Sequence, residues 1–117
     1  MTTVVFYKAD GCYYGFEEQG HTGYAESGDD ILCSALSAMT MLIINTVEIS
    51  YAARVDYTID EKTTDVTVRI PSALPENESD EKKQFAISGL LQGYFYQLMD
   101  LTEDYYDFLS VEEIEDK

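Results

Sequence analysis

An uncharged stretch over residues 31–47 constrains the fold more than any other part of the chain. Its apolar side chains recur with helical spacing out to about Ser50, at Leu32, Leu36, Met39, Ile43 and Val47. The stretch falls a little short of a membrane span and is interrupted by polar residues, so we interpret it as a buried helix of a soluble protein. A helix with one apolar face needs a second layer to cover that face.

The segments on either side of this helix are typical of strands. Residues 3–9 and 12–18 are rich in β-branched and aromatic side chains, and Asp10-Gly11 between them is a strong hairpin turn signal. Residues 54–59 and 65–70 alternate around a polar turn, and a proline follows the second of them. The sequence therefore predicts one β-hairpin before the helix and another after it.

A second helix and a last strand complete the expected order. Asn77 or Ser79 is the expected N-cap of this helix, because both have cap-forming side chains. Its apolar face is made of Ile87, Leu90, Leu91, Tyr94, Leu98 and Leu101. Residues 105–111 predict a strand, and the acidic tail after them is expected to fray.

The order ββαββαβ predicts an α+β fold in a single domain over residues 1–117. We expect a two-layer sandwich in which a mostly antiparallel sheet carries both helices on one face. On the second helix, Gly89 and Gly93 form a flat strip that favours close packing against the first helix, with a dimer contact as the alternative. Aromatic residues off the main stripe, such as Phe85 and Tyr96, leave room for self-association.

The charge balance limits the partners. The chain has 23 acidic and 7 basic residues and a net charge of −16, whereas a phosphate backbone attracts the opposite sign. Direct nucleic-acid binding is therefore not expected. Such a field attracts basic peptides, although the same charge also serves as an ordinary solvated surface. The N-terminal residues lack the pattern of a secretory signal, so we expect a cytoplasmic protein with no membrane partner.

Two residues are candidates for nucleophilic catalysis. His21 is the only histidine, so any His-dependent chemistry must use it, and it lies at the start of a Gly-rich segment over residues 20–28. Asp29 or Asp30 can cap the helix. With Asp30 as N-cap, Cys33 falls in the first helical turn, where unpaired N–H groups and the helix dipole stabilise a thiolate. Helical geometry places Cys33 on the border of the apolar sector, so a small core residue is the alternative interpretation.

The neighbouring residues have two interpretations each. Ser37 lies one turn after Cys33, either close to the thiol or facing water. Asp30 either orients His21 as a third catalytic group or only caps the helix. Cys12 is predicted to be structural, because its strand offers nothing that would activate a thiol. A zinc site made of Cys12, His21 and Cys33 would need a fourth ligand and lacks a close-pair spacing, so no metal or other cofactor is expected.

The stretch over residues 20–38 resembles the ribosomal-processing cysteine protease Prp family. Its members share a Gly-His pair, a Gly-rich loop and an Asp-Ile-Val-Cys motif followed by small residues and a Ser, which correspond here to Gly20-His21, Asp30-Ile31-Leu32-Cys33 and Ser37. The departures, Thr22, Leu32 and Ser34, remove no reactive group. In the C-terminal half the resemblance rests on the order of elements.

The resemblance implies a homodimeric cysteine endopeptidase that removes a short N-terminal extension from large-subunit ribosomal protein number twenty-seven before ribosome assembly. Cys33 would be the nucleophile and His21 the base. The supporting positions would be Gly20, Asp30 and Ser37, and a loop containing Thr22, Gly23, Tyr24 and Gly28 would fold over the bound peptide.

Two other functions remain open at this point. In the first, the chain is a non-catalytic acidic binding module or assembly factor for a basic ribosomal protein, and His21 and Cys33 are incidental. In the second it is a thiol redox protein, which the absence of a C-x-x-C pair disfavours.

Overall fold

The computed structural model describes residues 1–20, 27–60, 62–63 and 65–116, with the backbone alone for residues 27–30. Its strands and helices are β1 (Thr2–Ala9), β2 (Cys12–Gln19), α1 (Ser27–Asn45), β3 (Asp56–Ile59), β4 (Val66–Arg69), α2 (Glu81–Asp104) and β5 (Leu109–Glu115). A π-helical turn, Thr46–Ser50, extends α1, and two short 3₁₀ turns, Pro71–Ala73 and Pro75–Asn77, lie between β4 and α2.

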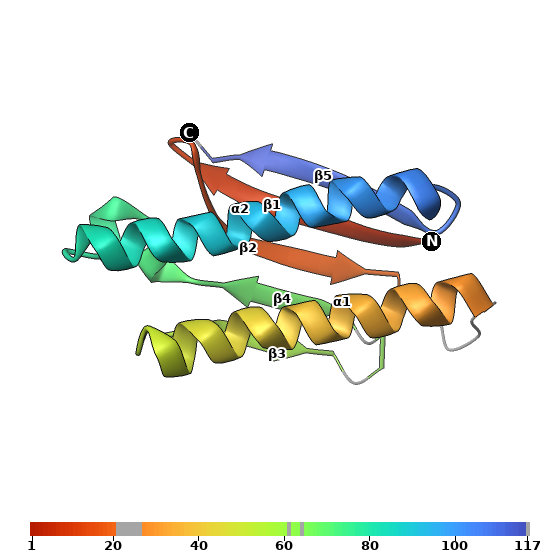
Figure 1. Ribbon diagram of the computed structural model, residues 1–117, viewed down its shortest axis with the longest axis horizontal. Coiled ribbons are helices and arrows are strands. Elements are labelled where there is room, and N and C mark those ends of the chain that lie inside the picture. The colour runs from red at the N-terminus through yellow and green to blue at the C-terminus, as the bar shows by residue number, and fades with distance from the viewer. Residues whose placement is uncertain (21–26, 61, 64, 117) are drawn as a thin grey trace.

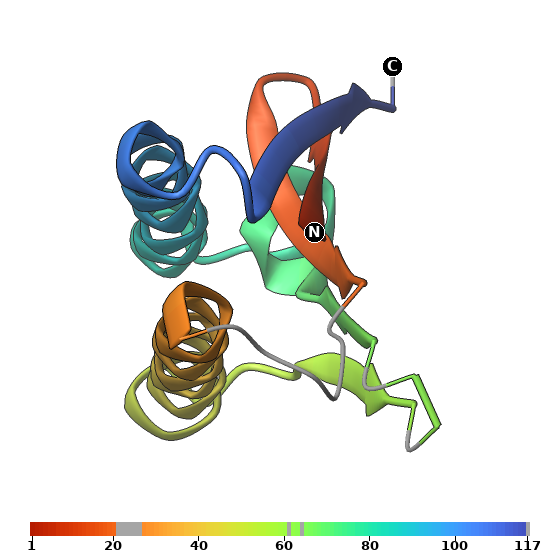
Figure 2. The same cartoon turned by 90° about the vertical axis from the view of Figure 1, so that its right-hand side faces the viewer.

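The five strands form one mixed sheet in the order β3-β4-β2-β1-β5. Neighbouring strands are antiparallel except β1 and β5, which are parallel. Both helices pack on the same face, with α2 over the half of the sheet that contains β1 and β5 and α1 over the half that contains β4 and β3 (Figures 1 and 2). The predicted α+β sandwich, mostly antiparallel with two helices on one face, is therefore confirmed.

The core lies between the sheet and the helices. Four strand side chains in it are fully buried, namely Val4, Phe6, Phe16 and Val68. The helices contribute Leu32, Leu36, Ile43, Ile87, Leu91, Tyr94 and Leu98. These are positions that the period-2 and period-3.6 patterns predict to face inward. Phe6 lies at the centre, and the centre of its ring is 5.6 Å from that of Phe16 and 5.6 Å from that of Tyr94.

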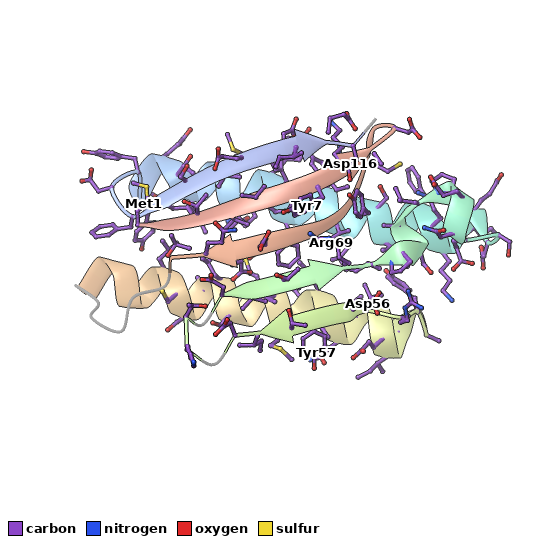
Figure 3. All side chains as sticks on the ribbon, turned by 180° about the vertical axis from the view of Figure 1, so that it is seen from behind. Met1, Tyr7, Asp56, Tyr57, Arg69 and Asp116 are labelled. Atoms are coloured by element: carbon purple, nitrogen blue, oxygen red, sulfur yellow. The ribbon has the colours of Figure 1, made fainter. Side chains whose placement is uncertain are left out.

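The other face of the sheet carries no helix, as the view from behind shows (Figure 3). Tyr7 donates a hydrogen bond of 2.6 Å to Glu17, and the Arg69 guanidinium lies 3.9 Å from the centre of the Tyr7 ring. A cation over an aromatic face at this distance is attracted by the ring quadrupole. Glu17 of β2 therefore lies on the open face of the sheet. Because side chains alternate along a strand, its neighbours on β2 face the helices.

The start of α1 differs from the expectation. The helix begins at Ser27, so Asp29 and Asp30 lie inside it and the prediction that one of them is the N-cap is wrong. Acidic residues are stabilised throughout the first turn by the helix dipole as well as at the cap. For this reason, two successive aspartates in a sequence do not show whether they cap a helix or lie in its first turn.

The cap of α2 also differs, although only by a few residues. The Asp80 side chain accepts hydrogen bonds from the N–H groups of Lys82 and Lys83, at 3.0 and 3.3 Å, and so occupies the position that was predicted for Asn77 or Ser79. Asn77 ends a 3₁₀ turn instead. The segment offers several cap-forming residues in succession, and their order alone does not identify the one that is used.

The C-terminal strand lies further along the chain than predicted, and part of the acidic tail belongs to it. β5 spans Leu109–Glu115, where residues 105–111 were expected. It pairs in parallel with β1 along its whole length, and the Asp116 N–H donates to the Lys8 carbonyl oxygen at 2.6 Å. This backbone pairing outweighs the low strand propensity of glutamate. The acidic side chains also protect an exposed sheet edge from pairing with other chains.

Gly89 and Gly93 do not bring the two helices into close contact, so that prediction is wrong. A Cβ atom added at either glycine would meet no atom within 4 Å. Both border an open groove of about 400 Å³ between α1 and α2. The groove is lined by Met39, Leu42, Ile43, Gly89, Leu90, Gly93, Tyr94 and Gln97.

Within the part of the chain that the structure describes, one helical stretch, Ile31–Ser50, is long and apolar enough to cross a membrane by length and composition. The core helix of a soluble protein passes the same test. Here Leu32, Leu36 and Ile43 pack into the core between the helices and the sheet.

Replacing Asp80 tests the helix cap. We expect Asp80→Ala to lower the free energy of unfolding by about 1 kcal/mol, because the Lys82 and Lys83 N–H groups lose their acceptor. Ser79→Ala and Asn77→Ala should each change it by less than about 0.5 kcal/mol. Urea denaturation followed by circular dichroism measures all three variants. A loss for Ser79→Ala equal to that for Asp80→Ala would contradict the assignment.

Candidate active site

Cys33 lies on α1, half-buried, between residues that belong to opposite environments. Leu32 and Leu36 beside it are buried, whereas Ser34 and Ser37 are exposed. The predicted border position of Cys33 on the helix is thus confirmed. Its sulfur is neither enclosed in the core nor fully in solvent, which is the setting in which a thiol can be both oriented and reached.

The expected first-turn position of Cys33 is wrong. Because α1 begins at Ser27, Cys33 is the seventh helical residue and lies in the second turn. The N–H groups left unpaired at a helix start belong to the first four residues, and the dipole effect falls off within the first turn. A thiolate at Cys33 therefore depends on a nearby base or cation more than on the helix start.

Gly20 directly follows the central strand β2 and has a conformation that requires glycine. Its φ is +85°, and an added Cβ would overlap the carbonyl oxygen of Met1. The Gly20 N–H donates a hydrogen bond of 3.2 Å to the Asp65 carboxylate. The end of β2 is thus held by the N-terminus and by the segment before β4. Gly20 directly precedes His21, so this junction determines where the candidate base begins.

Several predicted site residues lie outside what the structure describes. These are His21, Thr22, Gly23 and Tyr24, and their expected roles stay predictions. Gly28 and Asp30 are described by their backbone, which is helical, so the Gly-rich loop does not extend through Gly28 as expected. The catalytic role of Asp30 stays a prediction, as does a role for Ser37, whose side chain is exposed one turn after Cys33.

A buried polar cluster joins the central strand to both helices, and sequence reasoning did not identify it. Glu18 on β2 is only 2% exposed and Thr40 on α1 is 5% exposed. The Thr40 hydroxyl donates to Glu18 Oε1, and the Tyr94 hydroxyl of α2 donates to the same oxygen at 3.1 Å. Burial and then the negative charge of Glu18 raise the pKa of the Tyr94 hydroxyl, which therefore stays a donor.

One sequence signal could have identified this cluster. Glu18 follows Phe16 by two residues on a strand whose alternate side chains face the core, so the pattern places a carboxylate among inward-facing residues. A carboxylate in that position needs hydrogen-bond donors, and Thr40 and Tyr94 supply them.

Cys12 is the first residue of β2 and lies at the opposite end of that strand from Gly20, roughly 25 Å away at the rise of a β-strand. It is half-buried, and the Gln84 side-chain amide donates to its sulfur at 3.8 Å. The zinc site considered above would need these two ends together. Among the residues that the structure describes, no three His, Cys, Asp or Glu side chains group as metal ligands.

Comparison with known structures places this fold among those of bacterial proteins. SMU.848 from Streptococcus mutans has a TM-score of 0.80 and 24% identity, and the match covers 99% of both chains. The essential ribosomal processing protease Prp from S. aureus, solved with a substrate peptide, has a TM-score of 0.79 and 20% identity over 97% of this chain and 100% of that one. No curated protein sequence matches the chain significantly.

A second S. aureus Prp structure holds a covalently linked product peptide and has a TM-score of 0.75 and 21% identity, over 97% of this chain and 100% of that one. At these identities the likeness establishes the fold. The family follows from the sequence itself, because the family model for the cysteine protease Prp matches residues 1–110. The match includes both Gly20 at the end of β2 and Cys33 on α1, and the chain therefore belongs to the cysteine protease Prp family and is a cysteine peptidase.

Proposed function

We propose that this peptidase removes the N-terminal extension of large-subunit ribosomal protein number twenty-seven in the cytoplasm, with Cys33 as nucleophile and His21 as base. The observation that carries the proposal is the placement of a half-buried cysteine on α1, the helix that begins at the end of the sheet where β2 ends (Figure 1). The only histidine of the chain follows directly after that strand end. The S. aureus Prp captured with a covalently linked product peptide supports a covalent mechanism.

The chemistry follows from a thiol and an imidazole. His21 accepts the Cys33 proton, and the thiolate attacks the carbonyl carbon of the scissile bond. The C–N bond then breaks, and the leaving amine takes the proton from His21. Water, deprotonated by the same imidazole, hydrolyses the thioester and releases the extension as a free acid. No cofactor is needed in this sequence of steps.

We expect the oxyanion site to lie nearer to Cys33 than the first residue of α1. Ser27 precedes Cys33 by six residues, or about 9 Å along the axis of α1. Oxyanion donors must lie within hydrogen-bond distance of the carbonyl that the thiolate attacks. We therefore expect the donors to lie nearer to the sulfur than the N–H group of Ser27 at the very start of α1.

The net charge of −16 supports a basic substrate. A negatively charged surface concentrates positively charged chains around it and accelerates their encounter. Ribosomal proteins are basic because they bind RNA, and so they match this field. The acidic surface would then assist capture, while the cleavage itself belongs to Cys33.

We also propose that the chain forms a homodimer through the outer side of its helices. Along α2 an exposed stripe at helical spacing contains Phe85, Gly89, Gly93 and Tyr96, and Phe85 is 78% exposed. Two aromatic side chains thus flank two glycines that leave open space above them. In a twofold dimer such a stripe is self-complementary, because the aromatic residues of each copy can lie over the glycines of the other.

Replacing each of the two cysteines in turn distinguishes a peptidase from a non-catalytic binding module. We expect Cys33→Ala to abolish truncation of the extended ribosomal protein, whereas Cys12→Ala keeps the wild-type rate, because Cys12 lies at the far end of β2. Mass spectrometry of the incubated protein measures the loss of the N-terminal segment. Truncation at the wild-type rate by Cys33→Ala would contradict the proposal and favour the acidic binding module, and dependence on Cys12 would favour the redox alternative.

Alanine substitutions at Gly20 and Gly11 test the role of the junction that follows β2, with Gly11 as the control. Both have positive φ, +85° and +83°, but an added Cβ meets backbone only at Gly20. Gly11→Ala should therefore cost about 1 kcal/mol of stability and leave cleavage unchanged. Gly20→Ala should cost more and reduce kcat by at least about tenfold, because it displaces the segment before His21. Equal effects of the two variants on kcat would refute the role of this junction.

The oligomeric state tests the helix stripe. We expect wild-type protein to elute as a dimer in size-exclusion chromatography with light scattering. Phe85→Glu should shift it to a monomer, because it buries a charge at the proposed contact. Ile114→Glu is the control, since Ile114 is 48% exposed and pairs with Tyr7 on β1, whose ring lies on the open face of the sheet. A monomeric wild-type protein, or a dimeric Phe85→Glu variant, would rule out this interface.

A further inference from the structure

We propose that Glu18 is a positioning residue of the peptidase. Its buried carboxylate, bound by Thr40 and Tyr94, holds α1 at one register on the central strand, and this register determines where Cys33 lies relative to the end of β2. The inference rests on the proposed function, in which Cys33 reacts with the help of the residue that follows Gly20.

The first step is the location of Glu18. It lies on β2, the central strand, and faces the seam between the helices, because it accepts hydrogen bonds from one residue of each helix. Thr40 and Tyr94 are themselves in contact, with 3.5 Å between their hydroxyl oxygens. A single carboxylate therefore joins three elements that the backbone hydrogen bonds do not connect.

The second step is the register between α1 and β2. Thr40 and Cys33 are seven residues apart, which is two helical turns, so they lie on the same side of α1 within about 20° and about 10 Å apart along its axis. Gly20 lies two residues beyond Glu18, or about 7 Å along β2. α1 begins at the end of the sheet where β2 ends and runs back along it (Figure 1). Cys33 therefore lies from Thr40 in the same direction as Gly20 lies from Glu18. The Glu18 to Thr40 hydrogen bond thus sets Cys33 near the end of β2.

The third step is the reason for a carboxylate at this position. Apolar contacts between a helix and a sheet are non-directional, and they tolerate small shifts of the helix along its axis. A buried carboxylate has an acceptable energy only while its donors remain in place, because losing one weakens the compensation of a charge in the core. Leu36, which lies between Cys33 and Thr40 on α1, is fully buried, so this part of the helix is packed on the core.

The chain offers a matched control for this role. Glu17 is the next residue on the same strand, but it faces the open side of the sheet and accepts a hydrogen bond of 2.6 Å from Tyr7. Glu17→Gln and Glu18→Gln change the net charge equally and remove the charge from a tyrosine-bound carboxylate in each case. Any effect of the overall field on substrate capture is therefore the same in the two variants.

The experiment measures kcat and KM for cleavage of a peptide that contains the extension and its cleavage site. We expect Glu18→Gln to lower kcat at least about tenfold with KM within about threefold of wild type, as for a misplaced nucleophile. Glu17→Gln should leave both values within about twofold. Thr40→Val should reproduce the loss of kcat, and Thr40→Ser, which keeps the hydroxyl, should restore most of it.

A second readout follows the thiol directly. The alkylation rates of Cys33 and Cys12 by iodoacetamide are measured separately by peptide mapping. If Glu18 positions Cys33, then Glu18→Gln and Thr40→Val slow alkylation of Cys33 by at least about threefold, because the thiol is removed from the base that activates it. The rate at Cys12 should be unchanged. Increased reactivity at both cysteines would indicate general loosening and would overturn the proposal.

The outcomes separate this inference from the function on which it rests. Wild-type kcat in folded Glu18→Gln, together with an inactive Cys33→Ala variant, would overturn the positioning role and leave the peptidase intact. Failure of the wild-type protein to cleave the peptide would instead reject the proposed substrate, and the alkylation rates would then decide about Glu18. If Glu18→Gln does not fold, as judged by circular dichroism, Thr40→Val decides by the same criteria.

Discussion

The structure is organised around β2, the central strand, which is hydrogen-bonded on both sides and has both helices packed above it. β1 and β4 pair with its two edges, and the outer strands attach to these neighbours. Two of its inward-facing side chains are Phe16, which belongs to the aromatic core, and Glu18, which is a buried carboxylate. The same strand therefore supplies packing energy at one position and a directional constraint two residues later. Its end at Gly20 is where the candidate catalytic segment begins.

The position of Cys33 on α1 suits a thiol that must be both oriented and accessible. Cys33 lies on the border between the buried and exposed sides of α1, so the core orients it while one side remains accessible. Because it lies in the second turn, the helix dipole offers it little. If Glu18 positions α1 as we propose, the reactivity of the thiol depends on how accurately α1 is placed on the sheet, which is a property of residues at a distance from the sulfur.

Local patterns predicted much of the fold. The apolar periodicity at Leu32, Leu36 and Ile43 identified α1, and the Asp10-Gly11 turn identified the first hairpin, because these features depend on neighbours along the chain. The first turn of α1 was misplaced because Asp29 and Asp30 suit a cap and a first turn equally. β5 was misplaced because its pairing with β1 is a long-range interaction that no local propensity reports.

The residues of the candidate site also divide into those that a local motif predicts and those that only the fold brings together. Gly20, His21 and Cys33 stand in one contiguous motif, so the sequence alone proposes them as candidates. Glu18, Thr40 and Tyr94 come from three elements, and only the fold brings them together. The glycines at 89 and 93 illustrate the converse, since their spacing suggested a helix contact where the structure has an open groove.

The central claim is that Cys33 is the nucleophile and that His21 activates it. The most direct measurement uses a peptide of the cleavage sequence ending in a chloromethyl ketone, whose chloride a thiolate displaces to form a stable thioether. Peptide mapping by mass spectrometry then locates the adduct. The account predicts a stoichiometric adduct on Cys33, none on Cys12, and a much slower reaction in His21→Ala. An adduct on Cys12, or equal labelling of Cys33 without His21, would contradict it.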